Sequence, residues 1–162
     1  MSAEEWDKVS KKPKDFAEDK YILTYFLGKD EKFKNEINKY AQKNGYSVVD
    51  ILSKDSKYYN IGPAEFLYLE EHASIICTDS FHASVFAIIF HVPFLVCERT
   101  DIKMSSRLDT LINKFELGDR KLNGEITDKK IACNYDIVND ILDAEYNKAS
   151  MFLSRALKKD KE

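Results

Sequence analysis

Cysteine, glycine and proline are all scarce in this sequence. The 162 residues include three cysteines, five glycines and three prolines, which excludes collagen-like chains and other Gly- or Pro-rich fibrous or disordered proteins. The cysteines, Cys77, Cys97 and Cys133, are odd in number and include no C-x-x-C pair, so neither a disulfide framework nor zinc-ligand spacing is present. We therefore expect three structural thiols and no bound metal.

The chain also lacks a basic excess and a long apolar run. Its 25 Lys and Arg and 28 Asp and Glu residues leave a net charge of −3, whereas proteins that bind nucleic-acid backbones usually carry excess positive charge. No apolar run approaches the roughly 20 residues that span a bilayer, and residues 1–14 are too charged for a signal peptide. We expect no nucleic-acid partner, no transmembrane segment and, by default, a cytoplasmic location.

What remains is the composition of a soluble globular protein, with 44% hydrophobic and 33% charged residues. Apolar, β-prone runs at 21–28, 46–52, 74–77 and 92–98 alternate with helical patterns at 30–44, from 63, from about 80 to 90, and at 108–117. Such alternation favours parallel strands with right-handed helical crossovers. We predict an α/β fold, namely a three-layer Rossmann-like domain with a mainly parallel sheet and helices on both faces.

The ends of the chain are expected to differ from this core. Residues 1–19 are predicted to be a linker with a short helix that turns Trp6 and Val9 towards the body, 20–157 to be the Rossmann-like domain, and 158–162 to be a charged tail. Within the domain, 119–130 has the composition of a loop with one short edge strand, and 136–157 that of a long final helix. Its apolar positions, predicted to share one face, are Ile137, Ile141, Leu142, Tyr146, Ala149, Phe152 and Leu153.

The most informative segment is Thr78-Asp79-Ser80-Phe81-His82, between the third strand and an apolar helix. Thr, Asp and Ser are favourable N-cap residues, so this helix is expected to begin near Ser80 with His82 in its first turn. A helix N-terminus at the carboxyl end of a parallel strand offers free N–H groups and a partial positive charge to an anion. Ligands of parallel sheets also bind beyond this edge.

Three cations follow the next strand, Arg99, Lys103 and Arg107, and are placed to lean over the same helix N-terminus. With His82 as general acid, they would complete an anion site. The alternative interpretation is that Asp79 and Ser80 only cap the helix while His82 packs on the surface. The residue pattern alone leaves both interpretations open.

Other candidate residues have simpler explanations. His72 and His91 each lie near the end of a predicted helix, where an imidazolium is favoured, and no two histidines have metal-ligand spacing. Tyr58 and Tyr59 lie in a polar loop that follows a strand, so a role in lining the site remains an alternative to a structural one.

Several motifs resemble one known family in their order and spacing over about residues 20–120. They are Gly62-Pro63-x-x-Phe66, Thr78-Asp79-Ser80-Phe81-His82, Pro93-Phe94, Arg99 and Ser105-Ser106-Arg107. The combination is similar to the C-terminal half of the polysaccharide pyruvyl transferases. It departs from their usual pattern at Ala83, where glycine is common, which adds a methyl group near the helix start.

The resemblance implies a fold, an activity and site residues. The family transfers the pyruvyl group of phosphoenolpyruvate to a sugar as a ketal, using two Rossmann-like halves arranged as in a GT-B glycosyltransferase. His82 corresponds to the family's catalytic histidine. The donor's phosphate or carboxylate would be bound by Arg107 or Lys103, with Arg99 as the weaker candidate, at an anion site that also includes Asp79, Ser80 and Phe81. No cofactor is implied.

The same resemblance implies that the N-terminal half, which would contribute the acceptor site, is missing from this chain. We expect the chain to bind phosphoenolpyruvate weakly and not to turn over by itself. Two alternatives remain at this point. One is the nucleotide-sugar-binding half of a GT-B glycosyltransferase, although no Gly-rich phosphate loop is present. The other is a non-catalytic binding module that has kept the fold.

Overall fold

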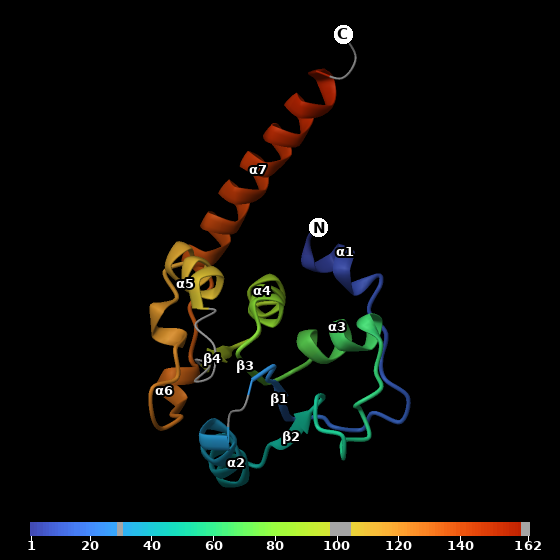
Figure 1. The fold of residues 1–162 in the computed structure, drawn as a ribbon, viewed down its shortest axis with the longest axis vertical. Helices are drawn as coiled ribbons and strands as arrows, with labels where there is room; N and C mark the ends of the chain where they lie inside the picture. Colours follow the sequence, from blue (N-terminus) through green and yellow to red (C-terminus); the bar gives the residue numbers. More distant parts are fainter. Residues whose placement is uncertain (29–30, 98–104, 160–162) are drawn as a thin grey trace.

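The computed structural model describes residues 1–28, 31–97 and 105–159 (Figure 1). Its strands are β1 (Tyr21–Tyr25), β2 (Ser47–Asp50), β3 (Ile75–Thr78) and β4 (Phe94–Val96). Its helices are α1 (Ala3–Asp7), α2 (Glu31–Asn44), α3 (Pro63–Glu71), α4 (Phe81–Ile89), α5 (Ser105–Lys114), α6 (Asp128–Ile131) and α7 (Asp136–Lys159), and Gly118–Arg120 forms a 3₁₀ turn, η1.

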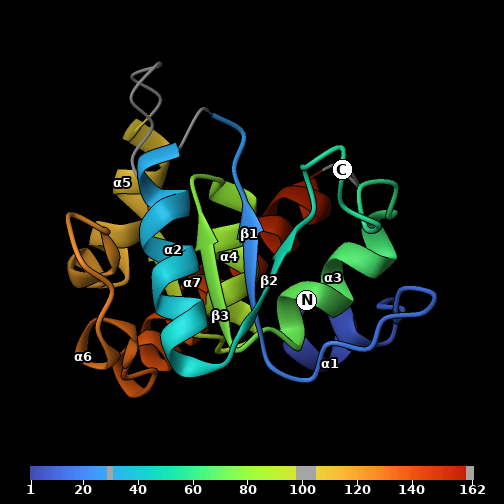
Figure 2. The same ribbon diagram turned by 90° about the horizontal axis from the view of Figure 1, so that it is seen from below.

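The four strands form one sheet in the order β2-β1-β3-β4, and every neighbouring pair is parallel. β1, β3 and β4 are short and mainly apolar, as expected where helices cover both faces of a sheet. In Figure 2, α2 lies on the near side of the sheet and α4 on the far side. The predicted α/β, Rossmann-like fold is confirmed.

Alternate residues of each strand point into two separate hydrophobic cores, as the pleat of a strand requires. Leu23, Ile76 and Phe94 belong to the core beneath α3, α4 and α5. Ile22, Cys77 and Leu95 belong to the opposite core, beneath α2 and the segment before α6. Because β1, β3 and β4 are buried on both faces, their residues are mainly apolar, whereas the edge strand β2 buries only Val49.

The N-terminal segment is only partly as predicted. α1 forms with a capping box between Ser2 and Glu5, and the Trp6 ring meets Phe86 of α4 edge-on at 5.1 Å between ring centroids. Val9, however, is 51% exposed. It lies beyond the end of α1 at Asp7, so it does not continue the helical face that carries Trp6.

The segment 119–130 contains less sheet than predicted. A single parallel bridge joins Lys121 to Val96 of β4 in place of an edge strand. The segment is held instead by Arg120, whose buried guanidinium donates to the Asp119 carboxylate and to the carbonyl of Ile131 at 3.0 Å. This buried arginine fixes η1 against α6.

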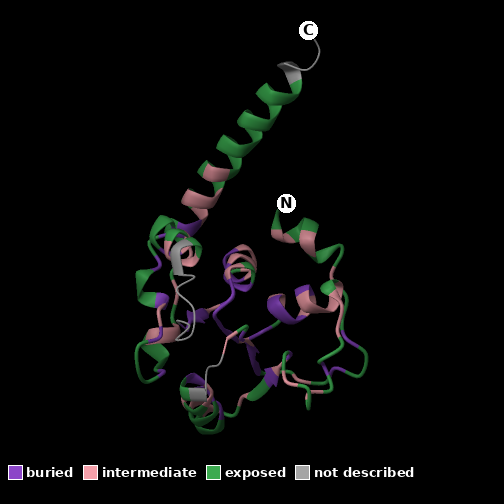
Figure 3. Cartoon of the chain, in the orientation of Figure 1, coloured by how far each residue is buried: buried purple, intermediate pink, exposed green. Residues whose placement is uncertain are grey.

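The final helix forms, but most of its predicted core face is not covered. Val138 is buried and Ile141 and Leu142 are half-buried at its base. Tyr146, Phe152 and Leu153 are 60%, 72% and 57% exposed. Figures 1 and 3 show why, because α7 extends well beyond the body that its first turns pack on. Among the helices in the described part of the chain, none is both long and apolar enough to cross a membrane.

Candidate functional site

The turn between β3 and α4 lies where the direction of the sheet's connections reverses. β1 continues into α2 on one face, whereas β3, its neighbour, continues into α4 on the other. The crevice between the carboxyl ends of two such strands is the usual ligand site of an open α/β sheet. The Asp79–His82 segment therefore lies at this switch point.

The first polar side chains of this turn bind the protein's own backbone. The Thr78 hydroxyl donates to the carbonyl of Tyr25 at 2.6 Å and accepts the Ser80 N–H at 3.0 Å. The two oxygens of the Asp79 carboxylate accept the N–H groups of Leu27 and Gly28, each at 2.8 Å. Asp79 thus ties the chain that leaves β1 to the chain that leaves β3.

Ser80 caps α4, as the sequence predicted. Its backbone is extended, its hydroxyl accepts the Ala83 N–H at 3.5 Å, and its carbonyl accepts the Ser84 hydroxyl at 3.0 Å. His82 follows as the second helical residue and is exposed. Ala83 is fully buried, so the methyl group that distinguishes it from glycine packs inside the turn and leaves the exposed side unobstructed.

One of the three predicted cations lies beside this helix start. Arg107, in the first turn of α5, is exposed, and its Cζ lies 5.6 Å from the centroid of the Phe81 ring. This geometry suits a cation–π contact. Arg99 and Lys103 lie outside the described residues, so the structure leaves their contribution a prediction.

Phe81 and Arg107 also line an open pocket of about 490 Å³ between α4, α5 and α7. Lys114 and Glu145, which also line it, form an ion pair at 2.6 Å, in which the hydrogen bond from the Lys114 ammonium lowers the pKa of the half-buried Glu145 carboxyl. Phe81 at the start of α4 and the exposed guanidinium of Arg107 therefore lie next to an open space that Leu111 and Phe115 also line, whereas His82 is not among its lining residues.

The remaining candidates lie elsewhere. The Tyr58 ring is buried against Phe16, which in turn packs on Tyr21 at the amino end of β1, so Tyr58 faces away from the ligand edge. His72 stacks on Tyr68, with 4.0 Å between ring centroids. His91 stacks on Tyr135 at 4.9 Å. These contacts match the structural roles expected of both histidines.

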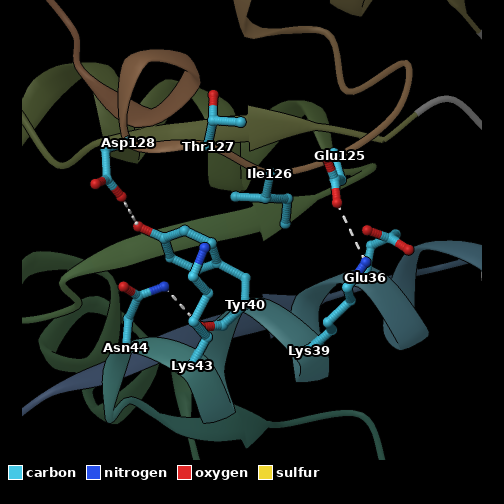
Figure 4. A pocket seen from close by; sticks show the side chains of 9 residues that line it. All are labelled: Glu36, Lys39, Tyr40, Lys43, Asn44, Glu125, Ile126, Thr127 and Asp128. Carbon is cyan, nitrogen blue, oxygen red and sulfur yellow. Dashed lines mark hydrogen bonds and ion pairs between the residues drawn. The ribbon is translucent and has the colours of Figure 1, made fainter.

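A second hollow, of about 260 Å³, lies between α2 and the segment before α6 (Figure 4). Tyr40 donates to the Asp128 carboxylate across it at 2.6 Å, and Lys39 donates to Glu125 at 3.2 Å. Because α2 covers the opposite face of the sheet from α4, this hollow is separate from the β3–α4 turn.

The burial of Glu70 was not predicted from the sequence. This residue of α3 is 0% exposed, and neither carboxylate oxygen has a hydrogen-bond partner. Desolvation raises the pKa of Glu70 well above its ordinary value. A signal was present, since Glu70 follows Phe66 by four residues and Leu67 by three and so lies on their helical face. Among the described residues, no group of three potential ligands could hold a metal ion.

Comparison with known proteins agrees with this architecture. Neither a search of curated proteins nor one of solved structures found a match. The family described as polysaccharide pyruvyl transferase matches residues 3–101, a range that holds all four strands, the Asp79–His82 turn and Arg99, and ends before Lys103 and Arg107. This match covers well over half of the chain, which therefore belongs to the polysaccharide pyruvyl transferase family.

Proposed function

We propose that this chain provides the donor-binding part of a pyruvyl transferase, which binds phosphoenolpyruvate for transfer of its pyruvyl group to a sugar as a ketal. The observation that carries the proposal is the exposure of His82 in the first turn of α4, at the sheet's switch point and one residue from the Phe81–Arg107 contact. Family membership supports a sugar as the other substrate.

The anion would lie against the start of α4. The first N–H groups of an α-helix have no intrahelical partner and carry a partial positive charge, which favours a phosphate or carboxylate. Arg107 presents a planar guanidinium that can bind two oxygens of such a group at once. Phe81 supplies an apolar wall for the methylene end of the donor.

His82 would act on the enol carbon. Ketal formation adds a proton to the methylene carbon of phosphoenolpyruvate while a sugar hydroxyl adds to the neighbouring carbon and gives up its own proton. A second sugar hydroxyl then displaces the phosphate. An exposed imidazole beside the bound anion is placed to donate the first proton as a general acid.

The direct contact predicted between the donor and Asp79 or Ser80 stays a prediction. The bonds of Asp79 to the Leu27 and Gly28 N–H groups, and of Ser80 to α4, favour an indirect role. A carboxylate facing a bound phosphate would also repel it. In this proposal both residues hold the helix start in place, and His82 and Arg107 contact the donor.

Calorimetric titration of the full chain with phosphoenolpyruvate tests this proposal. We expect weak binding that His82→Ala and Arg107→Ala each reduce by about tenfold, a change typical for loss of one charged contact. Matched controls are His72→Ala and Arg155→Ala, both exposed and remote from the turn. Binding of uridine diphosphate in place of phosphoenolpyruvate would favour the nucleotide-sugar alternative, and binding of neither would favour a non-catalytic module.

Residues 1–162 are expected not to turn over by themselves, because their motifs resemble the C-terminal half of the family and the acceptor site is expected in its N-terminal half. Incubation with phosphoenolpyruvate and a sugar acceptor should therefore release no phosphate. Phosphate release that depends on both substrates would show that the chain carries a complete site.

A further inference from the structure

Tyr25 ends β1 at the edge of the sheet where the donor is proposed to bind. The four residues before it in β1 are buried, whereas Tyr25 is half-buried. It is in parallel register with Thr78 of β3, whose hydroxyl donates to the Tyr25 carbonyl at 2.6 Å. Because Thr78 leads directly into the Asp79–His82 turn, Tyr25 lies at the same switch point.

The Tyr25 ring lies on the face of the sheet that α3 and α4 cover. Side chains alternate along a strand, so Tyr21, Leu23 and Tyr25 share one face, and all three contribute to the core beneath these helices. The Tyr25 ring meets Phe66 of α3 with 5.2 Å between ring centroids. Phe66 in turn meets Phe86 of α4 at 6.2 Å.

His82 lies on the same side of α4 as this aromatic cluster. It precedes Phe86 by four residues, and residues four apart lie one above the other on a helix. Phe81 is turned by about 100° from His82 around the helix axis and meets Arg107 of α5. The start of α4 is therefore flanked by Arg107 on the side of α5 and by Tyr25 on the side of α3.

The hydroxyl groups of the two tyrosines of β1 differ. The Tyr21 hydroxyl, at the amino end of the strand, donates to the carbonyl of Leu69 at 2.8 Å. Within residues 1–28, 31–97 and 105–159, no group forms a hydrogen bond with the Tyr25 hydroxyl. A tyrosine hydroxyl that leaves water usually finds a hydrogen-bond partner. The Tyr25 hydroxyl is thus available to a ligand at the switch point.

We propose that Tyr25 is a further donor-contacting residue, whose hydroxyl donates a hydrogen bond to an anionic oxygen of phosphoenolpyruvate. This inference rests on the proposed function and adds a contact from the side of α3. Phosphoenolpyruvate carries both a phosphate and a carboxylate, so it needs hydrogen-bond donors from more than one direction. Arg107 and Tyr25 supply them from the two sides of the helix start, and the bond from a phenol to an anionic oxygen is charge-assisted.

Tyr25→Phe removes the hydroxyl and keeps the ring that packs on Phe66. Because weak binding is expected, phosphoenolpyruvate is titrated into the full chain and followed by NMR chemical shifts. We expect Tyr25→Phe to weaken binding by about tenfold, as is typical for loss of one hydrogen bond to a charged group. Urea unfolding of the same proteins should show an unchanged midpoint, which a purely structural role of the hydroxyl would lower.

Tyr68→Phe is the matched control. Tyr68 is also half-buried, but its ring packs on Phe16 and His72, away from the switch point. This substitution should leave phosphoenolpyruvate binding unchanged.

The outcomes separate this inference from the proposed function. If the wild type binds phosphoenolpyruvate and Tyr25→Phe binds it equally well, the role of Tyr25 is wrong and the proposed function stands. Equal weakening by Tyr25→Phe and Tyr68→Phe, or weakening that accompanies a lower urea midpoint, also overturns the contact. If the wild type itself does not bind phosphoenolpyruvate, the proposed function fails, and the role of Tyr25 fails with it.

Discussion

Replacement of Glu70 by Gln should stabilise the chain, and increasingly so as the pH rises. Glu70 is fully buried in α3 without a hydrogen-bond partner for either oxygen, and its desolvation raises the pKa of the carboxyl well above the ordinary 4.5. The folded chain therefore keeps the proton at a pH where the unfolded chain has released it. Because the folded state then binds more protons, a rise in pH lowers the free energy of unfolding.

The size of the effect follows from this linkage. Each pH unit between the ordinary pKa and the raised one costs about 1.4 kcal/mol of stability. Each such unit is a substantial part of the 5–15 kcal/mol that stabilises a typical domain. Gln has nearly the same shape as Glu and carries no charge. Its buried amide would also lack hydrogen-bond partners, but its contribution to the free energy of unfolding would not depend on pH.

Urea unfolding of the wild type and Glu70→Gln from pH 4.5 to 8 measures this difference. The two proteins should be similar near pH 4.5 and diverge above it, with the variant more stable. Glu116→Gln, a substitution at an exposed position, is the control and should follow the wild type. A difference between wild type and Glu70→Gln that stays constant over the whole range would refute the assigned burial of an unpaired carboxyl.

Three further predictions concern side chains within the fold. Asp79→Asn leaves one side-chain acceptor for the N–H groups of Leu27 and Gly28 and should lower the free energy of unfolding, measured with urea, by about 1.5–3 kcal/mol. An unchanged urea midpoint would show that these two hydrogen bonds do not stabilise the fold. Arg120→Met should cost roughly 2–4 kcal/mol and speed amide hydrogen exchange in α6, because the carbonyl it binds loses its donor. A thiol reagent should label Cys133 alone in the folded chain. Cys77 and Cys97 are fully buried, and burial raises the pKa of Cys77 to about 12. Early labelling of Cys77 would contradict its position in β3.

β1, β3 and β4 could be predicted because burial on both faces leaves mainly apolar residues in them. Their ends were harder to predict. The first run continues to Gly28, but β1 ends at Tyr25, because the backbone beyond it leaves the sheet and its N–H groups turn to Asp79. The spacing of apolar residues along the sequence indicates which side chains can share a buried face. It does not indicate whether another part of the chain covers that face, as the exposed half of α7 shows.

Some features of the β3–α4 turn depend on neighbouring residues in the sequence, and others depend on residues that are distant in the sequence. Ser80 as the N-cap and His82 in the first turn follow from neighbouring residues, so the sequence predicted both. The partners of Asp79 lie about 50 residues earlier in the chain, and no local pattern contains them. The burial of Arg120 likewise depends on which helices and loops meet, so it became visible only in the assembled fold, whereas the helical spacing of Glu70 from Phe66 and Leu67 was a signal present in the sequence.

The contacts of the β3–α4 turn allow the proposed function to be tested by separating residues that hold the turn in place from residues proposed to contact the donor. The Asp79 carboxylate accepts the N–H groups of Leu27 and Gly28, and the Ser80 hydroxyl caps α4, whereas His82 and Arg107 are exposed at the start of α4. Loss of Asp79 should therefore lower stability and loosen the helix start, and it should weaken anion binding only through that displacement. Loss of His82 or Arg107 should weaken binding at unchanged stability. The ratio of the two effects, measured on the same variants, distinguishes a residue that positions the site from one that contacts the donor.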